Sequence, residues 1–158
     1  MKARARFLGH PIHQMLIVFP LGLLGTAVVF DLIYLVTHLQ SIALVAYWML
    51  AAGIVGAAAA IPFGIIDYTI IPAGTRAKRI GLMHGFGNGV VSVLFVLSWI
   101  MREQHSAPSA SALACSFLGL VLALITAWLG GELVSKLGVG VHEHASPNAP
   151  SSLKKEQR

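Results

Sequence analysis

The sequence predicts an all-α integral membrane protein, an up-down-up-down bundle of four transmembrane helices. Hydrophobic residues make up 56% of its 158 residues. Asp, Glu, Lys and Arg together make up only 11%, against about 25% in an average soluble domain. These few charges separate four long apolar segments, so we expect lipid rather than water to surround most of the side chains.

Each apolar segment is long enough to cross a bilayer, which takes about 20 residues. A spanning backbone must satisfy its own hydrogen bonds within the lipid, which predicts helices. Short connections between them predict antiparallel neighbours. The expected organisation is a basic N-terminus over residues 1–12, a membrane domain over residues 13–137 with helices at 13–37, 42–66, 80–101 and 111–133, and a tail over residues 138–158.

The first segment follows a basic stretch and therefore has some features of a signal peptide. We interpret it as a retained helix, because the apolar run is long, is closed by Asp31 and Tyr34, and has no small-residue cleavage site after it. Pro20 in this segment and Pro62 in the second each lack a backbone N–H. Both prolines are expected to kink their helices.

The later segments carry small residues at four-residue intervals, which let helix backbones approach closely in lipid. Pro72 and Gly74 break the chain before the third segment. Trp48 and Trp99 lie near predicted helix ends and are expected in the aromatic belt at the membrane surface. The small residues are Ala52, Gly56, Ala60 and Gly64 in the second segment, Gly81, Gly85 and Gly89 in the third, and Gly119, Ala123, Ala127 and Gly131 in the fourth.

The distribution of basic residues predicts the orientation. Ten of the eleven Lys and Arg residues fall on one side of the predicted membrane, and only Arg102 falls on the other. By the positive-inside rule both termini are therefore expected in the cytoplasm of a bacterium, with the protein in the inner membrane. The ten residues are Lys2, Arg4, Arg6, Arg76, Lys78, Arg79, Lys136, Lys154, Lys155 and Arg158.

The tail of residues 138–158 is rich in Ser, Pro, Lys and Glu and is expected to be disordered. His142 and His144 within it suggest a metal site, but a solvated tail is the preferred interpretation because no nearby residues complete such a site. The single cysteine, Cys115, allows no internal disulfide.

The predicted topology brings several ionisable residues to one level near the cytoplasmic surface. Asn88 follows His84 by four residues and extends a polar face along the third helix. Asp31 is the exception, since it lies eighteen residues after His13, about 27 Å along a helix, and so near the opposite surface. Its expected partner is His38, Tyr34, Tyr47 or water. The residues brought to the cytoplasmic level are His10, His13, Asp67, His84 and Glu132.

These side chains allow three kinds of chemistry. Imidazole and carboxylate ligands suit Zn, Fe or Mn, which makes all five residues candidate metal ligands. Two histidines on different helices can hold a haem b from both sides, and His13 and His84 are the favoured pair. Asp, Glu and His together can also form a proton relay. Alternatively, the cluster is a purely structural network that fastens the four helices together.

Several motifs resemble the domain of unknown function 2231. They are Gly9-His-Pro-x-His13, Phe19-Pro20-x-Gly22, Asp31, Gly64-x-x-Asp67, His84-Gly-x-x-Asn88 and a late Gly-Gly-Glu-Leu-Val-x-x-x-Gly138-Val-Gly-Val141. Members of that family are predicted bacterial four-helix membrane proteins without an established activity. Some are joined to Rieske-type iron–sulfur domains, so the resemblance implies a connection with electron transfer. Family members often have Pro after the second histidine, where this chain has Gln14.

The first functional hypothesis is therefore a redox-associated membrane module that binds haem b or a divalent metal. The second is a structural or assembly subunit with membrane-protein partners or further copies of itself. The third is a proton-coupled transporter that acts as an oligomer. Membrane lipid is the expected surrounding, nucleic acid is not an expected partner, and the chain lacks the nucleophile–base arrangement or phosphate loop of an enzyme.

Overall fold

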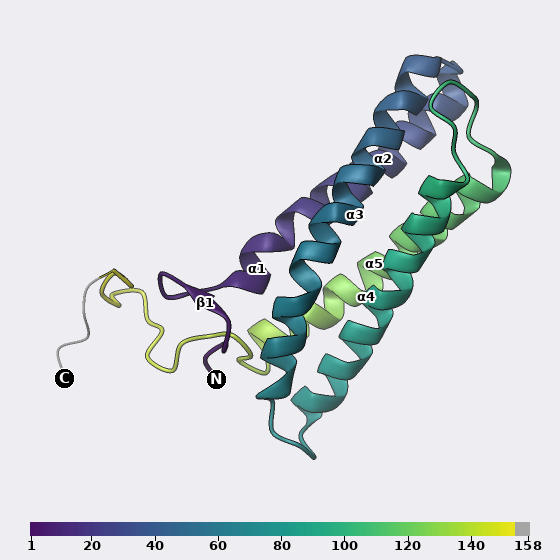
Figure 1. Cartoon of the computed structure of the whole chain (residues 1–158). Coiled ribbons are helices and arrows are strands. Elements are labelled where there is room, and N and C mark those ends of the chain that lie inside the picture. Colours follow the sequence, from purple (N-terminus) through teal and green to yellow (C-terminus); the bar gives the residue numbers. More distant parts are fainter. Residues whose placement is uncertain (154–158) are drawn as a thin grey trace.

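The computed structural model describes residues 1–153, and its helical part is a bundle of long antiparallel helices (Figure 1). Within the described residues, four spans are long and apolar enough to cross a membrane. Successive spans run in opposite directions in Figure 1, which agrees with the predicted fold class. The helices are α1 (Ile12–Leu16), α2 (Val18–Thr37), α3 (Gln40–Thr69), α4 (Arg76–Ile100) and α5 (Ala110–Ser135).

The first span is interrupted at Ile17, which separates α1 from α2. Pro20 provides the physical reason, because it has no N–H for the carbonyl of Leu16 and its ring crowds that carbonyl. The N–H of Leu21 resumes the pattern by donating to the Ile17 carbonyl at 3.1 Å. Pro62, in contrast, lies inside α3, which is assigned as one continuous helix.

Local hydrogen bonds cap the helix ends at the connections between helices. His38 ends α2 in the left-handed conformation, with φ 53°, and its N–H donates to the Tyr34 carbonyl. Thr75 is the N-cap residue of α4, and its side chain accepts a hydrogen bond from the Lys78 N–H. Ser109 is the N-cap residue of α5, and its side chain accepts a hydrogen bond from the Ala112 N–H. These caps satisfy backbone groups that a helix end leaves without a partner.

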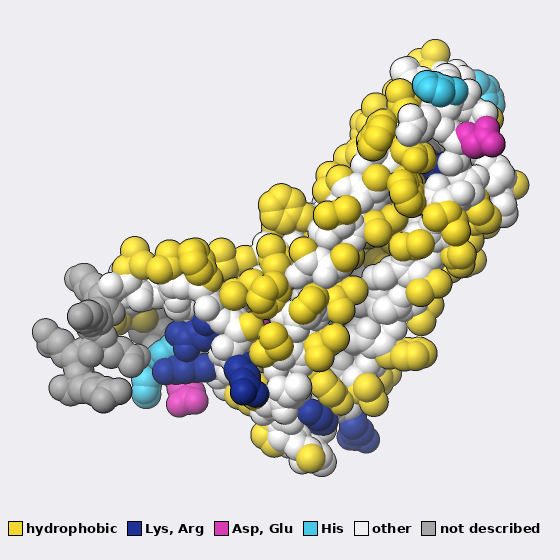
Figure 2. Space-filling view, viewed as in Figure 1, with side chains coloured by type: hydrophobic (Ala, Val, Ile, Leu, Met, Phe, Trp, Pro, Cys, Tyr) yellow, Lys and Arg dark blue, Asp and Glu magenta, His cyan; other side chains and the backbone are white. Residues whose placement is uncertain are grey.

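The bundle consists of two hairpins. In the first, α1 and α2 pack along α3, and in the second, α4 packs along α5, while the contacts between the hairpins are fewer. The hairpins meet in a buried cluster made of Leu24, Ala27 and Val28 of α2, Leu50 of α3, and Val91 and Phe95 of α4. Hydrophobic side chains cover most of the visible helical surface, whereas Lys and Arg gather at the end that carries the termini (Figure 2). An apolar exterior of this kind suits a bilayer.

The N-terminal segment contains structure that the sequence analysis did not predict. Strands β1 (Arg6–Phe7) and β2 (His10–Pro11) form a short antiparallel hairpin immediately before α1. The N-terminal amino group donates to the carbonyls of Gly138 and Val141, which ties the N-terminus to the segment that follows α5. No helix or strand occurs in residues 138–153, and the last part of the predicted disordered tail, residues 154–158, lies outside the described residues.

Trp99 faces the interior of the bundle near the end of α4. Its side chain packs against the central hydrophobic cluster, and its ring centroid lies 5.7 Å from that of Tyr47. Its Nε1 is buried and has no hydrogen-bond partner among the residues that the structure describes. The side chain of Trp48 is 55% exposed on the apolar exterior. Proximity to a helix end therefore did not distinguish a surface tryptophan from one that faces the neighbouring helix.

Candidate functional site

His13 extends from α1 onto α3. Its Nδ1 lies 3.0 Å from the carbonyl oxygen of Ala60. One turn farther along α3, Gly64 faces the imidazole ring, and a Cβ at Gly64 would lie 2.9 Å from His13 Cε1. The absence of a side chain at Gly64 therefore allows the ring to lie against the α3 backbone.

His84 extends from α4 onto α5 with the same arrangement. Its Nδ1 lies 2.9 Å from the carbonyl oxygen of Thr126. Gly130, four residues later, faces the ring, and a Cβ there would lie 3.0 Å from His84 Cε1. Each hairpin thus has one histidine on the side of its first helix, held by a carbonyl and a glycine of its second helix. The sequence predicted both histidines but not these matched supports.

The carbonyl contacts determine which ring nitrogen carries the proton. A carbonyl oxygen can only accept, so Nδ1 must be protonated and must donate in both histidines. The lone pair of a neutral imidazole then lies on Nε2. A metal-ligating histidine in proteins usually donates its other N–H to a backbone carbonyl or carboxylate in this way.

Asn88 and Thr126 surround His84. Asn88 Nδ2 lies 3.4 Å from His84 Nδ1 and 3.2 Å from Nε2. A donor aligned with the Nε2 lone pair would lie much farther from Nδ1 than from Nε2, so the amide nitrogen does not occupy the lone-pair direction. Asn88 instead donates to the His84 carbonyl at 2.9 Å, and its Oδ1 lies 3.0 Å from the Thr126 hydroxyl, which donates to it.

The other predicted ligands lie in separate interactions. Asp67 accepts hydrogen bonds from the backbone N–H groups of Arg4 and Ala5, at 2.8 and 3.0 Å. Glu132 forms an ion pair with Arg76 at 2.7 Å. His10 is exposed in β2, and its Nε2 lies 3.3 Å from the Ser152 hydroxyl. Asp67 and Glu132 therefore tie the helix ends to neighbouring segments.

Metal binding by the whole predicted cluster has no geometric support. Across residues 1–153, no group of three or more His, Cys, Asp or Glu side chains is placed to hold a metal ion. The common membrane depth that the topology implies did not bring the five side chains into one coordination sphere. His13 and His84 are left as a pair of candidate ligands, one from each hairpin.

A second polar cluster lies near the opposite end of the bundle. Asp31 of α2 forms a bidentate ion pair with Arg102, which follows α4, at 2.6 and 2.7 Å. Ser116 of α5 donates to Asp31 at 2.9 Å, and Arg102 also donates to Ser98. The exposed side-chain fractions of Arg102 and Asp31 are 2% and 0%. The expected partners of Asp31 were therefore wrong, although Arg102 was recognisable as the only basic residue on that side.

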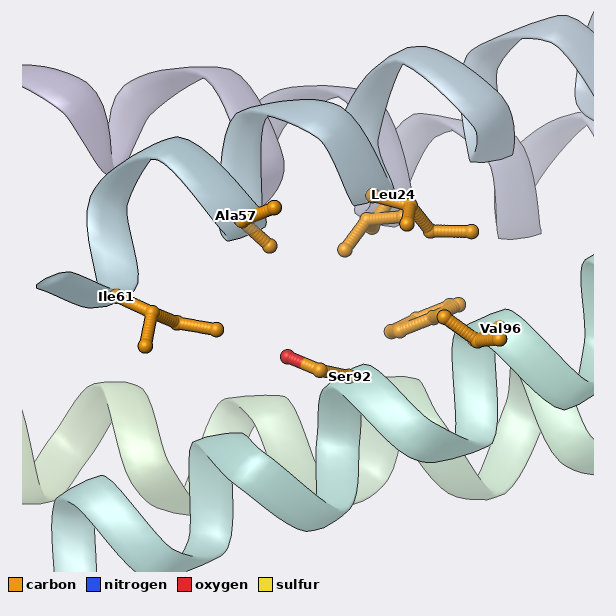
Figure 3. Close-up of a pocket in the computed structure, with 8 residues that line it drawn as sticks. Leu24, Ala57, Ile61, Ser92 and Val96 are labelled. Atoms are coloured by element: carbon orange, nitrogen blue, oxygen red, sulfur yellow. The ribbon is translucent and has the colours of Figure 1, made fainter.

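Between the two polar clusters, an apolar cleft of about 130 Å³ separates the hairpins (Figure 3). Ile61 in its wall follows Ala60, the residue that holds His13. Ser92 in the opposite wall donates its hydroxyl proton to the Asn88 carbonyl at 2.8 Å. The walls are formed by Leu24, Ile54, Ala57, Ala58, Ile61, Ser92, Phe95 and Val96.

Comparisons with known proteins identify the family. No curated protein and no solved structure gave a match. The family described as predicted membrane protein, DUF2231, matches residues 9–143. The matched region includes β2, helices α1 to α5, His13 and His84, and the Asp31–Arg102 ion pair. The chain therefore belongs to the DUF2231 family of predicted membrane proteins.

Proposed function

We propose that this protein is a redox-associated membrane module that binds haem b through His13 and His84. The observation that carries the proposal is the matched support of the two imidazoles. In each hairpin, Nδ1–H donates to a carbonyl of the second helix, at 3.0 Å for His13 and 2.9 Å for His84. Both rings thus keep the Nε2 lone pair as a ligand atom, and His13 and His84 would hold the haem iron from the two hairpins.

The surroundings of the pair suit a hydrophobic cofactor. The cleft beside Ala60 and Asn88 has apolar walls, and it opens between hairpins that contact each other less than their own helices do. A porphyrin is larger than this cleft, so haem binding requires the hairpins to separate further at this end. The Asp31–Arg102 pair would hold them together at the other end during such a movement. Bound haem would supply a one-electron centre, while the protein orients both imidazoles and excludes water.

Absorption spectroscopy of the purified protein tests this proposal. We expect protein in mild detergent, after reconstitution with haemin, to bind one haem with the spectrum of a six-coordinate low-spin iron. His13→Ala and His84→Ala should each remove that spectrum. His10→Ala is the matched control, because His10 is an exposed histidine outside the pair and should be dispensable. Absence of stoichiometric haem, or equal loss in the His10→Ala protein, would refute the proposal.

Several acidic side chains hold segments of the chain together, which favours an alternative function as a scaffold or assembly subunit. Asp67, Glu132 and Asp31 are each engaged by another part of the chain. On this hypothesis His13→Ala and His84→Ala lower stability or the yield of a copurifying membrane partner without changing any spectrum. Transport by an oligomer stays a prediction, which proton flux in liposomes would test.

We further propose that both termini lie in the cytoplasm and that the membrane is a bacterial inner membrane. The support is the sequence asymmetry of basic residues. Lys and Arg also gather at the terminal end of the molecule in Figure 2. His13 and His84 would then lie toward the cytoplasmic side of the membrane, and the Asp31–Arg102 ion pair toward the periplasmic side.

A further inference from the structure

The β1–β2 hairpin presents two large apolar side chains at its tip. Phe7 pairs with His10, so Leu8 and Gly9 form a two-residue turn. Both turn residues have positive φ, 49° for Leu8 and 90° for Gly9. This turn favours Asn-Gly or Gly-Gly, and a leucine at positive φ is strained. Phe7 is 58% exposed and Leu8 is 60% exposed, so burial within the described chain does not explain why apolar residues occupy the tip.

Basic side chains flank this apolar tip. Arg4 and Arg6 are exposed. Arg6 donates through Nε to the Gly9 carbonyl at 3.3 Å, which orients the guanidinium and leaves its terminal nitrogens for another acceptor. Lys2 and Arg6 also line a small polar cleft beside Gly140. Asp67, which contacts this segment, directs its carboxylate to backbone N–H groups of residues 4 and 5.

The hairpin lies where the first span enters the bilayer, because β2 ends at Pro11 and α1 begins at Ile12. Figure 2 shows hydrophobic side chains along one edge of the terminal segment, in line with the apolar exterior of the helices, and Lys and Arg along the other edge, with acidic and His side chains beside them. Apolar and basic groups arranged in this way match the bilayer interface, where acyl chains meet anionic headgroups.

We propose that the segment of residues 2–11 is an interfacial anchor that binds the headgroup of an anionic phospholipid. Arg4 and Arg6 contact the lipid phosphate, while Phe7 and Leu8 enter the boundary of the acyl chains. A basic residue close to an anionic membrane surface contributes about fivefold to lipid affinity. The same charges could attract free phosphate, but only a phospholipid also uses the apolar tip. This proposal does not depend on haem binding.

Lipid selectivity in reconstituted vesicles tests the anchor. The full chain is placed in phosphatidylcholine vesicles with a trace of spin-labelled phosphatidylglycerol or spin-labelled phosphatidylcholine. Electron paramagnetic resonance then measures the motionally restricted fraction of each label. We expect several-fold selectivity for phosphatidylglycerol, and about a fivefold loss in Arg4→Gln and in Arg6→Gln. Lys136→Gln, an equal charge change on an exposed residue at the end of α5 and outside the hairpin, is the matched control and should lose less selectivity than either arginine variant.

A turn variant separates the anchor from a purely structural hairpin. Leu8→Gly relieves the strain of positive φ and should leave thermal stability unchanged or raised. It should nevertheless weaken phosphatidylglycerol association by at least about fourfold, the effect of one buried methylene, because the substitution removes four side-chain carbons. Equal restriction of both lipids, equal losses in Arg6→Gln and Lys136→Gln, or unchanged association in Leu8→Gly would overturn the proposal. Full displacement of the lipid by inorganic phosphate would overturn the assignment to a phospholipid.

Discussion

The ion pair between Asp31 and Arg102 shows how strongly single residues can matter in this chain. Both charges are buried, and every oxygen of the Asp31 carboxylate has a donor, from Arg102 or from Ser116. Taking the charges out of water is expensive, so the pair itself adds little net stability. Removal of one partner strongly destabilises the fold, because it leaves the other charge buried and without a counter-charge.

We therefore expect Asp31→Asn to lower the free energy of unfolding by about 3–5 kcal/mol. The physical reason is that the Arg102 guanidinium loses its counter-charge while remaining enclosed between α2, α4 and α5. Thermal unfolding in detergent, followed by circular dichroism, measures the change. Glu103→Gln is the matched control, since Glu103 is exposed and its substitution should change stability by less than about 0.5 kcal/mol.

The double variant Asp31→Asn with Arg102→Gln should be less destabilised than the sum of the two single variants. Neither remaining side chain then carries an uncompensated charge, so the coupling between the sites should be about 0.5 kcal/mol or more, the order found for contacting residues. Simple additivity of the single variants would contradict the view that the ion pair is a closed unit.

Gly64 and Gly130 allow a second prediction at the residue scale. A Cβ at either position would lie 2.9 or 3.0 Å from the Cε1 atom of His13 or His84, so the imidazole must move away from its carbonyl partner. Gly64→Ala and Gly130→Ala should therefore weaken haem binding at least tenfold. Stability should change little, because the roughly 1 kcal/mol gain in helix propensity offsets the lost hydrogen bond. Haem titration and thermal unfolding together check both parts.

Gly85→Ala is the control for these two variants. A Cβ at Gly85 would have no heavy atom within 4 Å, and Gly85 lies one residue after His84 on the same helix. Haem affinity should stay at the wild-type level in Gly85→Ala. A parallel loss there would mean that glycine matters for α4 as a whole and not for the position of an imidazole.

At the scale of elements, hydropathy predicted the helices and local capping determined their ends. The helix predicted at 42–66 is α3, Gln40–Thr69, in the structure, and the helix predicted at 80–101 is α4, Arg76–Ile100. The helices extend beyond the apolar core because caps such as Thr75 satisfy end groups at the membrane surface. The β1–β2 hairpin was missed because its Leu8-Gly9 turn does not have the usual turn composition.

The Thr75 cap gives a prediction for the start of α4. Thr75→Ala removes the acceptor for the Lys78 N–H, which lies 3.1 Å from Thr75 Oγ1. We expect a loss of about 1 kcal/mol in the free energy of unfolding, measured by thermal unfolding in detergent. Thr75→Ser keeps the hydroxyl and should retain nearly all of the stability. Equal losses in both variants would show that the methyl group, and not the cap, is responsible.

At the scale of the whole molecule, the arrangement of two hairpins explains how distant residues meet. His13 and His84 belong to different hairpins, and so do Asp31 and Arg102, which are 71 residues apart. His13 and His84 lie at the end of the bundle where an apolar cleft separates the hairpins. Asp31 and Arg102 lie where an ion pair joins the hairpins. The sequence predicted different levels along the helices for these two pairs, and the structure places them toward opposite ends of the bundle.

Reporter fusions test the orientation of the whole chain. With both termini in the cytoplasm, a green fluorescent protein at the C-terminus should fluoresce and an alkaline phosphatase there should be inactive. The same phosphatase inserted at His105, between α4 and α5, should be active because that loop would face the periplasm. The reverse pattern would contradict the orientation that the distribution of Lys and Arg predicts.

By itself, the sequence determined that the protein is a set of four apolar helices and that its ionisable side chains gather near the helix ends. It could do so because membrane crossing depends on properties of each segment alone, namely its length, its hydropathy and its need to satisfy its own backbone. Only the tertiary structure decided which side chains meet. The rotation of each helix about its axis directed Asp31 to Arg102 and Asp67 to backbone N–H groups, and it placed each imidazole against a glycine. That rotation follows from the packing between helices, which no single segment contains.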